Sequence, residues 1–93
     1  MNHSQKIRCE KIAEHYGRKT QERQTVSELS ELMYVLTRRP DQRQPDWTNE
    51  LLDEIADVSI MMQQMMHLYD ISSDELNERI NYKLKRQLGR MEG

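Results

Sequence analysis

Two stretches of the chain share one pattern: ELSELMYVL at residues 28–36 and EIADVSIMM at residues 54–62. They align without gaps. Both begin with an acid, an aliphatic residue, a small residue, a second acid and a second aliphatic residue. Two further residues and two apolar residues complete each stretch. On a helix with about 100° between successive residues, the apolar positions of each stretch form one stripe, and both acids lie on the same shoulder of it. The two stretches therefore predict two similar amphipathic helices, each carrying two carboxylates beside its apolar face.

Few helix breakers surround these segments, because proline occurs only at positions 40 and 45 and glycine only at 17, 89 and 93. The segment RRPDQRQPDW at residues 38–47 is the one clear loop. Helices are predicted over Ser4–Tyr16 ending at Gly17, over Lys19–Arg38, from Asp46 or Thr48 to Tyr69, and from the capping-box pattern of Ser72 and Glu75 to Leu88. The sequence thus predicts an all-α fold, an antiparallel bundle of about four helices forming a single domain over residues 1–93.

The apolar content is low for a chain that folds alone. Only 35% of the residues are hydrophobic, phenylalanine is absent, and the mean hydropathy is -0.99. A small domain buries a small share of its surface, so we expect oligomerisation to complete the bundle, as a homodimer or homotetramer. The single Cys9, the lack of a long apolar run and the net charge of -2 predict a soluble cytoplasmic protein without general affinity for membranes or nucleic acid.

The loop determines how the two acid pairs meet. Glu31 lies eight residues before the predicted turn and Glu54 six residues after it, so both lie about 10 Å from the turn of an antiparallel hairpin. The acids expected to converge are Glu28, Glu31, Glu54 and Asp57. Either pair alone would more often be solvated surface, but four clustered carboxylates repel one another unless protons or metal ions compensate. Ligands that are all oxygen atoms favour Mg²⁺ or Mn²⁺.

The sequence also resembles a known family. The order of Gln21, SELSEL (27–32), NELLDEIADVSIMM (49–62) and KLKRQLGR (83–90) is similar to that of the MazG-like all-α nucleoside triphosphate pyrophosphohydrolases, over roughly residues 16–90. The resemblance implies Mg²⁺-dependent hydrolysis of the α–β phosphoanhydride of a nucleotide to a monophosphate and pyrophosphate, by a bundle that dimerises or tetramerises. One departure is Ser27, where many relatives have a further glutamate.

These expectations assign roles to individual residues. Glu28, Glu31, Glu54 and Asp57 would hold the metal, and Glu28 or Glu31 would orient or deprotonate the attacking water, although spacing does not identify the base. On the last helix, Lys83 lies at the margin of the apolar stripe and Arg86 and Arg90 on its shoulder, where they suit a triphosphate. Their alternative is a solvated basic face.

Two further candidates for substrate binding have a structural alternative. Gln21 could bind substrate by hydrogen bonding or cap the bundle. Trp47 could stack on a base or anchor the packing at the start of the third helix. Glu50, one turn before Glu54, is expected to be exposed.

Two competing functions remain open. Phosphoribosyl-ATP pyrophosphohydrolase would share the architecture, although other motifs of that enzyme are not found. A non-enzymatic helical adaptor would need only the apolar stripes, and neither the aligned acid pairs nor Lys83.

Overall fold

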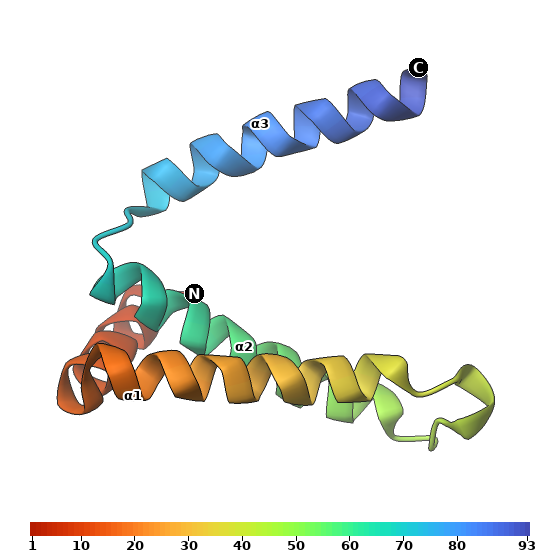
Figure 1. Ribbon diagram of the computed structural model, residues 1–93, viewed down its shortest axis with the longest axis horizontal. Helices are drawn as coiled ribbons and strands as arrows, with labels where there is room; N and C mark the ends of the chain where they lie inside the picture. The colour runs from red at the N-terminus through yellow and green to blue at the C-terminus, as the bar shows by residue number, and fades with distance from the viewer.

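A computed structural model describes residues 1–93 as three α-helices with short connections (Figure 1). They are α1 (His3–Thr37), α2 (Trp47–Leu68) and α3 (Ser73–Glu92), and a 3₁₀ turn, η1 (Pro40–Gln42), lies in the loop between α1 and α2. No strand is present, so the predicted all-α class is confirmed. None of the helices combines the length and the apolar character that crossing a bilayer requires.

Gly17 bends α1 sharply into two arms. The helix begins with a capping box, in which the Asn2 side chain accepts from the Gln5 backbone N–H and the Gln5 side chain accepts from that of Asn2, both at 2.8 Å. At Gly17 the backbone has φ +84° and ψ 170°, which is not helical and is accessible mainly to glycine. The predicted break at Gly17 is therefore a bend without a loop. The expected count of about four helices is reached only when the two arms are counted separately.

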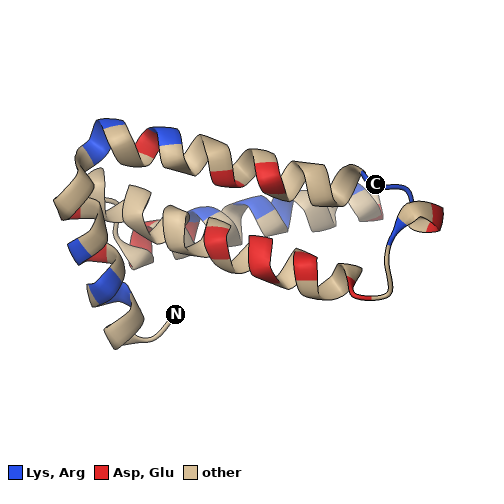
Figure 2. Ribbon diagram, turned by 90° about the horizontal axis from the view of Figure 1, so that it is seen from below, with Lys and Arg blue, Asp and Glu red and all other residues tan.

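The second arm of α1 and α2 form an antiparallel hairpin (Figures 1 and 2). Near the loop, the Trp47 indole N–H donates to the Val35 carbonyl at 3.0 Å. At the opposite end, the buried Gln21 amide donates to Gln64 Oε1 at 2.7 Å. Only seven of the 93 residues are buried, so the core between these helices is thin.

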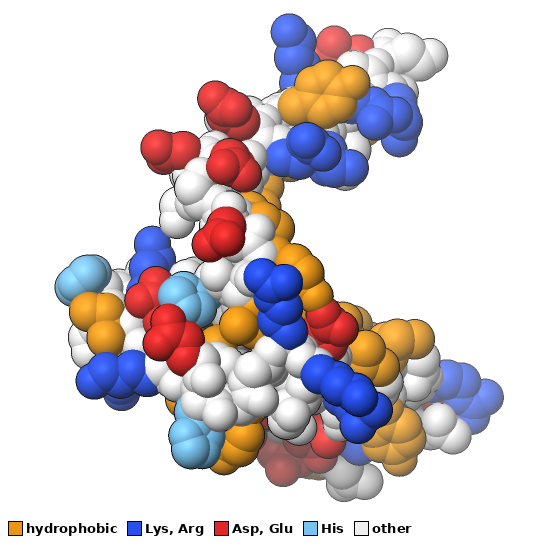
Figure 3. Space-filling model, turned by 60° about the vertical axis from the view of Figure 1, so that its left-hand side comes forward, with side chains coloured by type: hydrophobic (Ala, Val, Ile, Leu, Met, Phe, Trp, Pro, Cys, Tyr) orange, Lys and Arg blue, Asp and Glu red, His pale blue; other side chains and the backbone are white.

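The third helix packs against neither α1 nor α2. α2 ends where the Ile71 N–H donates to the Met66 carbonyl at 2.9 Å, and α3 begins where Ser72 caps the Glu75 N–H at 3.0 Å. Figure 3 shows α3 standing away from the hairpin. Its apolar stripe, exposed by 40 to 81%, consists of Leu76, Ile80, Leu84, Leu88 and Met91. A single chain therefore forms a helical hairpin with a projecting helix, and not a closed bundle.

Candidate metal centre

Four carboxylates from the hairpin meet between the second arm of α1 and α2. Each offers one oxygen atom, and these four atoms all lie within 4.8 Å of one another. The residues are Glu28 and Glu31 from α1 and Glu54 and Asp57 from α2. In Figure 2, acidic positions (red) lie along both helices of the hairpin. We call this set the acid cluster.

The repeated sequence pattern explains why the four side chains meet. Acids three residues apart lie on neighbouring positions of one helix face, and the antiparallel hairpin brings that face of α1 opposite the matching face of α2. The loop between Thr37 and Trp47 sets both pairs at the same height. Periodicity within the helices and the length of one loop are thus enough to assemble the cluster.

The cluster has too few hydrogen-bond donors for its charge. Oε2 of Glu28 and Oε2 of Glu54 are buried and have no hydrogen-bond partner. The only side chain that donates to the cluster is the Gln24 amide, which reaches Glu28 Oε1 at 2.8 Å. Buried polar atoms are normally hydrogen-bonded, and an unpaired buried carboxylate oxygen is costly. Both orphaned oxygens therefore point to a missing partner that is positively charged or carries a proton.

Burial and mutual repulsion raise the pKa of two of the acids. Removal from water raises the pKa of Glu54 most, and the charges of Glu31, Asp57 and Glu28 raise it further. For Asp57, removal from water again raises the pKa most, and the charges of Glu28 and Asp53 raise it further. For these two acids, the folded environment without a cation thus favours the protonated form more than water does.

The residues fit a hard divalent cation. Four carboxylates within 4.8 Å supply only oxygen ligands, the donor type that Mg²⁺ and Mn²⁺ prefer. A cation would satisfy the buried oxygens of Glu28 and Glu54 and would offset both the burial and the repulsion that raise the two pKa values.

The basic residues that sequence reasoning assigned to substrate lie elsewhere in the single chain. Lys83, Arg86 and Arg90 are on α3, which does not contact the hairpin. The Arg86 guanidinium instead lies 5.8 Å from the centre of the Tyr82 ring. One chain does not bring these three residues to the acid cluster.

Gln21 and Trp47 make the contacts of packing residues. Gln21 is buried and its amide is engaged with Gln64. Trp47 donates to the Val35 carbonyl, and the Arg43 guanidinium lies 3.8 Å from the centre of its ring. Of the two alternatives that the sequence left open for each residue, these contacts favour the structural one.

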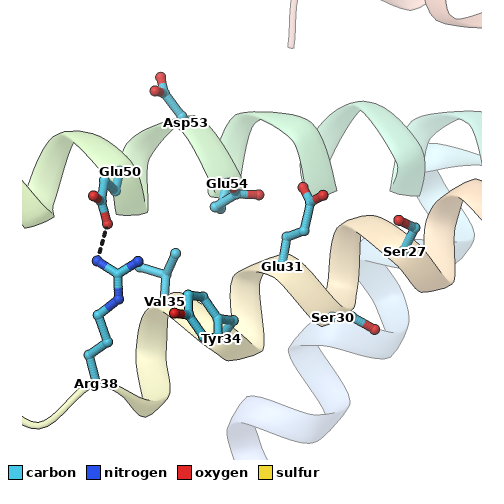
Figure 4. A pocket seen from close by; sticks show the side chains of 9 residues that line it. All are labelled: Ser27, Ser30, Glu31, Tyr34, Val35, Arg38, Glu50, Asp53 and Glu54. Atoms are coloured by element: carbon cyan, nitrogen blue, oxygen red, sulfur yellow. Dashed lines mark hydrogen bonds and ion pairs between the residues drawn. The ribbon is translucent and has the colours of Figure 1, made fainter.

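A cavity of about 430 Å³ opens beside the acid cluster (Figure 4). It is lined by Ser27, Ser30, Glu31, Tyr34, Val35, Arg38, Glu50, Asp53 and Glu54. Glu50 is expected to be exposed, but it is half-buried and paired, since Arg38 Nη1 donates to Glu50 Oε2 at 2.6 Å. Sequence reasoning missed this pair. The available signal was spacing, since Arg38 lies two turns after Glu31 and Glu50 lies one turn before Glu54.

Comparison with known proteins adds no relative: no family model, curated protein or solved structure matches this chain. The acid cluster, its electrostatics and the cavity beside it are therefore the features that bear on the function of this chain.

Proposed function

We propose that the chain is a Mg²⁺-dependent nucleoside triphosphate pyrophosphohydrolase that cleaves the α–β phosphoanhydride to a nucleoside monophosphate and pyrophosphate. The observation that carries this proposal is the acid cluster, with its two buried carboxylate oxygens that no donor reaches. The family resemblance of the EIADV stretch at residues 54–58 supports it. Mn²⁺ would be able to replace Mg²⁺ at such a site.

The four acids have different positions and would therefore have different tasks. Glu28, Glu54 and Asp57 would hold the ion, and Glu31 would share in holding it. When bound, Mg²⁺ would neutralise phosphate oxygens and lower the pKa of a water molecule. Glu31 is exposed and lines the cavity, so it is better placed than Glu28 to orient or deprotonate the attacking water. Glu28 already accepts a hydrogen bond from Gln24.

A second copy of the chain would supply what one copy lacks. The hairpin exposes apolar side chains, among them Val26, Met33 and Leu52, each with 63 or 64% of its surface accessible. The apolar stripe of α3 is also exposed. Docking α3 of one copy on the hairpin of another would bury both surfaces. It would also bring the basic residues of α3, Lys83, Arg86 and Arg90, toward the acids and the substrate phosphates. The active form would then be a homodimer or a homotetramer.

Two alternatives make different use of the same surfaces. Phosphoribosyl-ATP pyrophosphohydrolase activity would need the same acid cluster with another nucleotide. The non-enzymatic adaptor is favoured by one observation, the long exposed apolar stripe of α3, but it does not account for the converging carboxylates.

A substrate screen tests the proposal. The full chain would be incubated with Mg²⁺ and the common and modified nucleoside triphosphates, with phosphoribosyl-ATP included, and pyrophosphate would be measured. We expect release from at least one nucleoside triphosphate and its loss in the variant Glu54→Gln. Release from phosphoribosyl-ATP alone would favour the related enzyme, and no release from any compound would favour the adaptor.

A further inference from the structure

The cavity beside the acid cluster has two chemically different ends (Figure 4). Glu31 and Glu54 of the cluster line one end, and Arg38 with Glu50 lines the other. Arg38 is the one basic residue among the nine that line the cavity. Arg38 is the C-cap residue of α1 and follows Glu31 by seven residues, about two helical turns, so the two lie about 10 Å apart along the helix axis.

The guanidinium group of Arg38 is oriented but largely unused. It has five N–H donors, and a single donor atom, Nη1, reaches an acceptor in the chain, Oε2 of Glu50. The ring of Tyr34 lies 5.0 Å from the guanidinium carbon and orients the group from another side. With 28% of its side chain exposed, Arg38 faces the cavity with free donors.

We infer that Arg38 binds the phosphate chain of the ligand in this cavity and that Glu50 occupies the guanidinium until a polyphosphate arrives. The inference rests on the proposed function, because it assigns to Arg38 the pyrophosphate portion of a nucleoside triphosphate whose α–β bond lies at the acid cluster. Arginine suits this task, since its planar fork matches two phosphate oxygens at once.

The exchange of partners is physically reasonable. The Glu50 side chain is 36% exposed, so its carboxylate can return to water when phosphate replaces it. Phosphate carries more charge than a carboxylate and offers more acceptor oxygens, so it can engage donors of Arg38 that Glu50 leaves free. Arg38 would thus hold the pyrophosphate portion from within the chain, independently of α3 of a second copy.

The competing explanation is a purely structural ion pair that ties the end of α1 to the start of α2. The two explanations differ in the effect of removing Glu50. A structural tie is broken equally by loss of either partner, whereas a phosphate-binding Arg38 is released when Glu50 loses its charge. Glu50→Gln and Arg38→Gln should therefore change ligand affinity in opposite directions.

Inorganic pyrophosphate with Mg²⁺ is the probe, and titration calorimetry of the full chain gives its Kd. We expect Arg38→Gln to weaken binding about tenfold or more, as loss of a charge-assisted contact does, and Arg38→Lys to restore part of it. Glu50→Gln should tighten binding several-fold. Arg39→Gln is the matched control: Arg39 is 68% exposed, pairs with Asp41 and does not line the cavity, so its loss should leave Kd unchanged.

Three results would overturn the inference. They are no binding of pyrophosphate by the parent protein, equal Kd values for the Arg38 and Arg39 variants, or a Glu50→Gln variant that binds as weakly as Arg38→Gln. The proposed reaction fails separately. If the nucleotide screen gave no pyrophosphate but Arg38-dependent binding persisted, the reaction would be wrong and the phosphate site would stand. If pyrophosphate were released from a nucleotide but Arg38→Gln bound pyrophosphate normally, the reaction would stand and the phosphate site at Arg38 would be wrong.

Discussion

At the scale of single residues, Glu54 is the acid whose negative charge is least well compensated when no metal is bound. Its Oε2 atom is buried without a partner, and three other carboxylates surround it. We predict that Glu54→Gln, which keeps the shape and removes the charge, leaves the metal-free protein as stable as the parent or more stable. Pyrophosphate release should fall by orders of magnitude, because the cation that neutralises the phosphates is held less well. Thermal unfolding and turnover measured on the same sample check both parts.

Glu22→Gln is the control for this substitution. Glu22 is exposed on α1 and forms no ion pair, so the control removes the same charge outside the cluster. Glu50 is unsuitable as a control because it pairs with Arg38. A Glu54→Gln protein that is destabilised yet fully active per folded molecule would contradict the metal assignment.

The pH dependence of stability gives a second prediction for Glu54. Its pKa in the folded state is raised above 4.5, the ordinary value that it has in the unfolded state. At pH values between the unfolded-state pKa and the folded-state pKa, the folded protein therefore binds more protons than the unfolded protein. The free energy of unfolding of the metal-free protein should therefore decrease as the pH rises above 4.5 through the raised pKa. The contribution of Glu54 is the difference between the parent and Glu54→Gln in urea unfolding at a series of pH values. If the stability of Glu54→Gln relative to the parent did not increase as the pH rises, the pKa of Glu54 would not be raised.

At the scale of the helices, the bend in α1 depends on Gly17. The conformation with φ +84° and ψ 170° costs other residues about 1–3 kcal/mol, while no atom stands within 4 Å of the position that a Cβ atom would occupy. Gly17→Ala should thus lower the free energy of unfolding by about 1–2 kcal/mol through the backbone alone, since alanine also restricts the unfolded chain. Urea denaturation measures this change.

Gly89→Ala is the matched control on α3. Gly89 is helical and equally open, so alanine should raise helix stability by about 0.5–1 kcal/mol. If both substitutions changed the free energy of unfolding in the same direction, the explanation of the Gly17 bend would be wrong.

Local signals account for most of what the sequence predicted at this scale. The break at Gly17, the loop of Pro40 and Pro45 and the cap at Ser72 are set by single residues, and the acid cluster follows from helical periodicity and loop length. The direction of α3 has no such local signal, because the apolar pattern of an amphipathic helix does not specify which surface the helix packs against. The pairing of Arg38 with Glu50 has no local signal either, because it joins residues 12 apart in sequence and depends on how the loop between the two helices folds.

At the scale of the whole molecule, the single chain exposes much of its apolar surface. Seven of 93 residues are buried, and none of them belongs to α3. Burial of apolar surface is the main favourable term in folding, so we predict a homodimer or a dimer of dimers in which α3 covers the hairpin of another copy. Light scattering at micromolar concentration checks the mass, and a compact monomer would contradict the prediction.

The apolar stripe of α3 provides the corresponding variant. Leu84→Glu places a charge in the middle of the stripe, where the side chain is half exposed in the single chain. Since burying an unpaired charge is costly, the variant should dissociate at concentrations where the parent remains assembled. Tyr82→Glu, at a position 60% exposed and outside the stripe, should dissociate much less.

Binding of a divalent cation by the acid cluster can be measured through the thermal midpoint of unfolding with and without Mg²⁺ or Mn²⁺. An ion that binds only the folded state adds RT ln(1 + [L]/Kd), about 2.7 kcal/mol at a hundredfold excess over Kd. We predict that the midpoint rises with either ion in the parent and in Glu22→Gln, and that Glu54→Gln loses most of the rise. A midpoint that does not move, or that moves equally in Glu54→Gln, would contradict cation binding by the acid cluster.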